Sequence, residues 1–224
     1  FIVRKLDEKY VETGFRHGQT ITACLVALSH GTNDAQKTMG IITLTLIAVG
    51  LQPSGSGPQL WVVAVCGLAI ALSTYMGGWR VIRTLGKGLT EIATPQGFAA
   101  EASSATTILV SSHLGFALST TQVCSGSIIG SGLGKKGGAI DWNVAARMLV
   151  AWLVTFPAAG VIGAAACAVA KINVWGTLAV AAITVVAALI IFRLSRRNPI
   201  NAMNVNEGSE VKVNAKVATA AAAA

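Results

Sequence analysis

Residues 31–37 read Gly-Thr-Asn-Asp-Ala-Gln-Lys and interrupt an apolar run that is long enough to cross a bilayer. Between Gly18 and Trp79, Asp34 and Lys37 are the only Asp, Glu, Lys or Arg residues. An Asp or Lys at the centre of a membrane helix costs roughly 2.5–3.5 kcal/mol. Such a cost is tolerated where the charged groups face a partner, a cavity or a substrate. The polar cluster therefore predicts a functional site.

The composition is that of an integral membrane protein. Hydrophobic residues make up 53% of the 224 residues and charged residues only 12%, whereas soluble domains carry about 25% charged residues. The mean hydropathy is +0.64. The net charge of +8 could suit nucleic acid, but the basic residues fall in loops between apolar segments, where they orient a membrane protein. We expect a lipid bilayer and no nucleic acid as the surroundings of this chain.

The apolar segments predict an all-α polytopic membrane protein. The expected helical spans cover about 20–49 (interrupted by the polar cluster), 60–79, 142–170 and 172–192. A further apolar segment, 97–132, is broken near its centre by Gly115 and by the hydroxyl run Ser119-Thr120-Thr121. Residues 52–58 are rich in Pro, Gly and Ser and predict a loop.

The basic residues favour a re-entrant hairpin for segment 97–132. If that segment enters and leaves on one side, the basic clusters share one face, and the opposite face holds only the 51–58 loop and the turn at Lys171. The positive-inside rule makes the basic face cytoplasmic. If the segment crossed once, the last cluster would lie outside. The residues concerned are Arg4, Lys5, Lys9, Arg16, Arg80, Arg83, Lys87, Lys135, Lys136, Arg147, Arg193, Arg196 and Arg197.

The two polar breaks suggest an anion site with a coupled cation. The second arm of the hairpin would begin at Ser119, which places three hydroxyls and free N–H groups at a helix N-terminus, where anions bind. Asn33 can add an amide donor. Asp34 would repel an anion unless a cation lies between them or Asp34 holds a proton. Such a site favours both ligands together, which is the basis of coupled transport.

Each of these residues also has a structural interpretation. Ser and Thr in membrane helices bond to carbonyls of the preceding turn or to a neighbouring helix. Asp34 and Lys37 are spaced i, i+3 and could neutralise each other. Glu101 could orient the hairpin rather than touch substrate, and His30 could carry a proton or be a satisfied interior histidine.

At these residues the chain resembles the inorganic phosphate transporter (PiT) family. Residues 30–40, HGTNDAQKTMG, resemble the G-A/T-N-D signature of the family's C-terminal repeat. GFAAE at 97–101, followed by LSTTQ at 118–122, resembles its second motif, usually written P-V-S-T-T-H. Residues 152–157, WLVTFP, are similar as well, and the resemblance covers roughly residues 16–192.

The resemblance implies a secondary transporter that carries phosphate across the plasma membrane with sodium or protons. Family members use two inverted repeats, each of which supplies an N-D motif and an S-T-T tip to a midplane site, and no resident cofactor is expected. Two positions depart from the pattern, since Ala117 replaces a Pro and Gln122 a His. By matching position, phosphate would be bound by Asn33, Ser119, Thr120 and Thr121, cation coupling would involve Asp34 (a possible sodium ligand) and Asn33, and supporting roles would fall to Glu101, Gln122 and Lys37.

One copy of each motif predicts the C-terminal half of a transporter. We expect a cytoplasmic segment over 1–18, a transmembrane repeat with a broken helix and a re-entrant hairpin over 19–193, and a tail over 194–224. The N-terminal repeat would precede this chain or form a separate one. A dual-topology homodimer should show little Lys/Arg bias between its faces, whereas this chain is biased.

Two other functions stay open. Hydroxyl and amide donors do not by themselves separate phosphate from sulfate, although phosphate can donate a proton to Asp34 and sulfate cannot. The chain could instead be a non-transporting membrane scaffold in which the polar motifs join helices. We do not expect an enzyme, because no nucleophile–base pair, metal cluster or Walker-type loop is visible.

Overall fold

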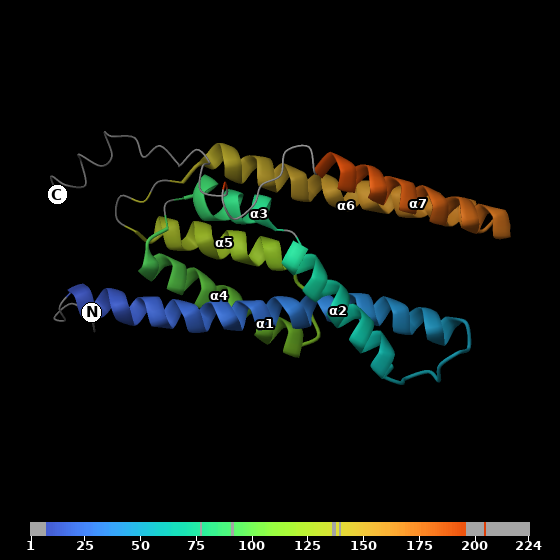
Figure 1. Cartoon of the computed structure of the whole chain (residues 1–224), viewed down its shortest axis with the longest axis horizontal. Helices are drawn as coiled ribbons and strands as arrows, with labels where there is room; N and C mark the ends of the chain where they lie inside the picture. Colours follow the sequence, from blue (N-terminus) through green and yellow to red (C-terminus); the bar gives the residue numbers. More distant parts are fainter. Residues whose placement is uncertain are drawn as a thin grey trace. The chain divides into compact units, whose positions relative to one another are not determined.

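The computed structural model describes residues 8–76, 78–90, 92–135, 138, 140–195 and 204. Every element in these ranges is a helix, which confirms the predicted all-α class, and the one β contact among them is an isolated bridge between Thr90 and Ile140. The chain divides between Ile140 and Asp141 into two compact units. The first unit holds α1 (Glu8–Ala48), α2 (Leu60–Met76), α3 (Trp79–Arg83), the π-helix η1 (Thr84–Gly88), α4 (Thr94–His113) and α5 (Thr120–Leu133), and the second holds α6 (Trp142–Ala170) and α7 (Val174–Ser195) (Figure 1).

Helix α1 runs without a break through the polar cluster. Its 41 residues are α-helical from end to end, so the interruption that we predicted at Asn33-Asp34 is wrong. A single glycine such as Gly31 is tolerated inside a helix at about 1 kcal/mol. The Thr32 hydroxyl donates to the carbonyl oxygens of Leu28 and Ser29 in the preceding turn. The polar side chains therefore find partners while the backbone keeps its hydrogen bonds.

The predicted break in segment 97–132 is confirmed as a helical hairpin. Helix α4 ends at His113, and Gly115 follows with φ +82°, a conformation that favours glycine. Ser119 is the N-cap of α5, and its Oγ accepts a hydrogen bond from the Gln122 N–H at 3.4 Å. In Figure 1, α4 lies along α1 and α5 lies beside α4. The start of the second arm at Ser119 is as the sequence predicted.

The hairpin packs closely against α1. A Cβ atom on Gly18 would lie 3.0 Å from the Phe98 ring, which stands edge-on to Phe15 at a centroid distance of 5.6 Å. Nearby, the Thr22 hydroxyl donates to the Glu101 carboxylate at 2.8 Å. A small residue, an aromatic pair and one polar bond thus hold α4 on α1, as is common where helices pack closely in lipid.

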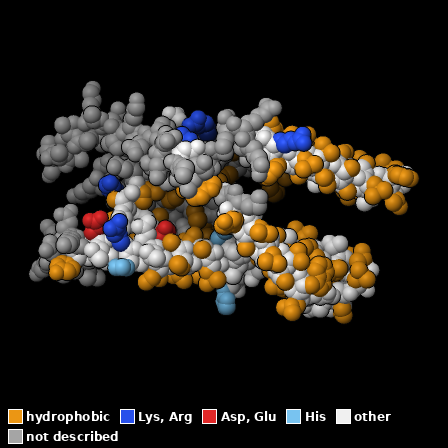
Figure 2. Space-filling model, in the orientation of Figure 1, with side chains coloured by type: hydrophobic (Ala, Val, Ile, Leu, Met, Phe, Trp, Pro, Cys, Tyr) orange, Lys and Arg blue, Asp and Glu red, His pale blue; other side chains and the backbone are white. Residues whose placement is uncertain are grey.

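The second unit is a pair of apolar helices joined by a short turn. Helix α6 covers the predicted residues 142–170, and α7 begins at Val174 rather than 172. Asp141 caps α6 by accepting from the N–H groups of Asn143 and Val144. Both helices are long and apolar enough to cross a membrane, by length and composition. Their surface is densely hydrophobic (Figure 2).

Candidate functional site

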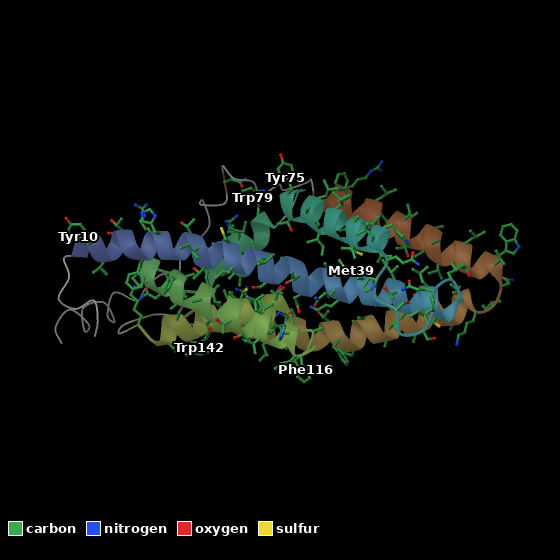
Figure 3. All side chains as sticks on the ribbon, turned by 90° about the horizontal axis from the view of Figure 1, so that it is seen from below. Tyr10, Met39, Tyr75, Trp79, Phe116 and Trp142 are labelled. Carbon is green, nitrogen blue, oxygen red and sulfur yellow. The ribbon has the colours of Figure 1, made fainter. Side chains whose placement is uncertain are left out.

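The polar cluster of α1 meets the turn of the hairpin. Asn33, whose side chain is only 2% exposed, donates from Nδ2 to the Leu118 carbonyl oxygen at 2.8 Å and to Asp34 Oδ1 at 3.0 Å. Its Oδ1 accepts from the Ser112 hydroxyl at 3.4 Å. Phe116, in the same connection, projects outward (Figure 3). Asn33 therefore joins the end of α4 and the residue before Ser119 to the middle of α1.

Lys37 reaches the same carbonyl oxygen. Its Nζ donates to the Leu118 oxygen at 2.6 Å and to Asp34 Oδ1 at 3.1 Å. The ion pair suggested by the i, i+3 spacing is thus present. Leu118 precedes Ser119, the N-cap of α5, so its carbonyl oxygen accepts no hydrogen bond from an N–H group of that helix. Two side chains of α1 donate to it instead.

His30 connects α1 to the first turn of α5. Its Nδ1 lies 3.0 Å from Thr120 Oγ1 and 3.4 Å from Asp34 Oδ2. The tautomer of His30 decides which atom donates to which. Thr120 is buried. The two carboxylate oxygens of Asp34 thus face two different partners, Lys37 and His30.

The predicted site residues separate into two groups. Four of them, Asn33, Asp34, Lys37 and Thr120, are joined directly or through Leu118 and His30. We call these six residues the tip network. Ser119 lies between two members of it along the chain and is exposed.

The other predicted residues have different surroundings. Glu101 bonds to Thr22, which precedes Asn33 by 11 positions, about 16 Å along α1. Thr121 and Gln122 are exposed in the first turn of α5. In the part of the chain that the structure describes, the side chains of these three residues make no hydrogen bond to the tip network. The proposed substrate roles of all the predicted residues remain predictions.

The arrangement suits an oxyanion. The first N–H groups of α5, those of Thr120 and Thr121, have no partner within the helix, and the helix dipole is positive at that end. The hydroxyls of Ser119 and Thr121 are exposed at the same end, and Lys37 brings a positive charge to the preceding carbonyl. Over the described residues, no group of three His, Cys, Asp or Glu side chains could hold a metal ion. Asp34 as a sodium ligand remains a prediction.

Sequence reasoning missed two partners and gave little weight to a third. The Leu118 carbonyl and the Ser112 hydroxyl carried no signal of their own, because their roles depend on how the hairpin folds onto α1. His30 did carry one, since it stands four residues before Asp34 on the same helical face.

Comparison with known proteins agrees with the motifs. A model described as the phosphate transporter family matches residues 3–163. A protein of Mycobacterium leprae named "Probable low-affinity inorganic phosphate transporter" is 51% identical over 212 residues, which are 93% of this chain and 51% of that protein. Proteins with the same name from Mycobacterium tuberculosis (53% identical, 91% of this chain and 49% of the relative) and Bacillus subtilis (40%, 68% and 46%) also match.

The chain spans about half the length of these curated relatives. No solved structure matches it. The family resemblance drawn from the two motifs is confirmed, and the relatives bear the names of transporters rather than enzymes, as predicted.

Proposed function

Because this chain belongs to the phosphate transporter family, we propose that it forms one half of a secondary transporter that moves inorganic phosphate across the plasma membrane by alternating access. The names of the relatives and the half-length match support this proposal. The other half, an inverted repeat with its own N-D motif and S-T-T tip, would complete the midplane site.

The observation that carries the proposal is the tip network. A buried asparagine and two ionisable side chains of α1 bond to residues that open α5. One such bond would be enough to join two membrane helices. Here several bonds converge on a helix N-terminus that has free N–H groups and exposed hydroxyls. Phosphate bound there would touch Ser119, Thr120 and Thr121.

Cation coupling would act through Asp34. Its carboxylate contacts Lys37 and His30 and would lie beside the proposed anion position. Phosphate and a proton or cation at this carboxylate would favour each other's binding, which is how two ligands are moved together. Breaking the bonds of the tip network would let the hairpin turn move relative to α1 between the two access states.

The length of the second hairpin arm, α5, supports a re-entrant placement. Helix α5 has 14 residues, about 21 Å at 1.5 Å per residue, whereas the hydrocarbon core is about 30 Å thick. This arm is too short to span by itself. The basic residues would then face the cytoplasm. Of those used in this argument, Arg4, Lys5, Lys136, Arg196 and Arg197 lie outside the described residues.

The test is phosphate uptake by the full-length transporter in liposomes, first with a sodium gradient and then with a proton gradient. Asp34→Asn and Thr120→Ala should each reduce uptake by about tenfold or more, because each removes a group from the tip network. Thr155→Ala is the matched control, since this exposed hydroxyl of α6 bonds only to its own helix at Ala151.

Three results would change the proposal. Uptake that survives Asp34→Asn and Thr120→Ala would remove the site assignment. Equal competition by sulfate would extend the substrate to oxyanions in general. Folded protein without any uptake would favour the scaffold function, in which the tip network only joins helices.

A further inference from the structure

Lys37 occupies a position between oxygen ligands. Its ammonium nitrogen lies 3.1 Å from a carboxylate oxygen of Asp34 and 2.6 Å from the main-chain carbonyl oxygen of Leu118. Carboxylate and main-chain carbonyl oxygens are the ligands that hard metal cations take in proteins. The place that a co-transported sodium would fill next to Asp34 therefore already holds a positive charge.

No other strong positive charge on the packed elements takes this position. Helices α2 and α5 have no charged residue, and the ionisable residues of α4 are Glu101, which bonds to Thr22 about 18 Å from Asp34 along α1, and His113. On α1 itself the nearest ionisable neighbour is His30, which faces the other oxygen of Asp34. The ammonium group of Lys37 is thus the compensating charge at this carboxylate.

We propose that Lys37 is the built-in cation of this half-site, so that phosphate binds here without sodium. The inference rests on the proposed phosphate-binding function. It excludes sodium as the ion that is coupled to phosphate at this half-site. A second cation is excluded from the same oxygens, because two positive charges would share one carboxylate and one carbonyl. An ammonium group has three N–H donors. Two point to Asp34 and Leu118, and the third is left for an anion at the start of α5.

The built-in cation also explains why the polar cluster carries both signs. Asp34 and Lys37 together are neutral. The transporter without substrate can therefore change between its two access states without an uncompensated charge in the low-dielectric interior. A carrier that used sodium at Asp34 would have to return with a bare carboxylate or with a proton. Coupling at this half-site then falls to a proton carried on phosphate or at the Asp34–His30 contact.

The test removes the positive charge of Lys37 and asks whether sodium can replace it. The purified full-length transporter is compared with Lys37→Gln and Lys37→Arg in sodium chloride and in choline chloride at equal ionic strength. In choline, Lys37→Gln should bind phosphate about tenfold more weakly than the parent, and sodium should restore most of that loss. Lys37→Arg keeps the charge and should not respond to sodium. Lys171→Gln, in the turn after α6, is the control for loss of a lysine.

A second measurement needs no phosphate. Sodium should raise the melting temperature of Lys37→Gln above its value in choline by more than it does for the parent, because the vacated oxygens bind the ion. The double variant Asp34→Asn/Lys37→Gln lacks the carboxylate and should lose this gain. If the parent binds no phosphate, the proposed function fails while the melting temperatures still decide this inference. An equal response to sodium in the parent and in Lys37→Gln, or a phosphate affinity of Lys37→Gln equal in the two salts, would overturn it.

Discussion

Asn33 and Leu118 are 85 positions apart in the chain, and the amide Nδ2 of one donates to the carbonyl oxygen of the other at 2.8 Å. This contact explains how α1 tolerates a polar cluster without opening its backbone. The polar groups are satisfied from outside the helix, by a hairpin turn whose own carbonyl needs donors. The same contact places the N-terminus of α5 beside Asp34 and Lys37.

Replacing Asn33 should weaken the fold. Asn33→Ala removes the amide that bonds to Leu118, Asp34 and Ser112, and we expect a loss of about 1–3 kcal/mol in the free energy of unfolding. Denaturant unfolding in detergent measures this loss. Asn143→Ala, an exposed position in the first turn of α6, is the control and should change stability little. Equal small effects at both positions would show that the Asn33 bonds do not stabilise the hairpin.

The contact between His30 and Thr120 predicts energetic coupling. The two side chains meet at 3.0 Å, so His30→Ala and Thr120→Val should each cost about 0.5–1.5 kcal/mol, and the double variant should cost less than their sum. Unfolding of the two single variants and the double variant gives the coupling energy. Strict additivity would mean that the hydrogen bond contributes nothing to stability.

Glu101 should prove to be a residue that orients the hairpin rather than one that binds substrate. Glu101→Ala leaves the Thr22 hydroxyl without its acceptor across the helices and should lower stability by about 1–3 kcal/mol. Glu101→Gln retains an acceptor oxygen and should restore most of that stability. In both variants the affinity of the folded protein for phosphate should match the parent. A large loss of affinity in Glu101→Gln, without a loss of stability, would instead assign Glu101 to the site.

Local patterns in the sequence were enough to predict the extent of α6 and the place of the hairpin connection. The turn at Lys171 follows the end of α6, while Gly115 and Ser119 mark the two ends of the hairpin connection. Each of these signals acts within a few residues of the boundary, so it can be read without knowing the fold.

The course of α1 through its polar cluster could not be predicted in the same way. Asp34 and Lys37 are costly in an apolar run, and a broken helix is one way to accommodate them. The other way is a distant partner, and only the folding of the hairpin onto α1 reveals Leu118 as that partner. The joining of His30 to Thr120, 90 positions apart, was hidden for the same reason.

The close approach of α4 to α1 should make Gly18 sensitive to a single added methyl group. A Cβ on Gly18 would lie 3.0 Å from the ring of Phe98, and that ring is held edge-on by Phe15. Gly18→Ala should therefore force the aromatic pair or the helix to shift, at a cost of about 1–3 kcal/mol. Gly14, one turn earlier on the same helix, has nothing within 4 Å of its would-be Cβ. Gly14→Ala should be neutral or stabilise by about 0.5–1 kcal/mol, because alanine favours the helix. Thermal unfolding of the two variants measures the difference, and a Gly18→Ala variant as stable as Gly14→Ala would show that the hairpin sits farther from α1 than the close packing at Phe98 requires.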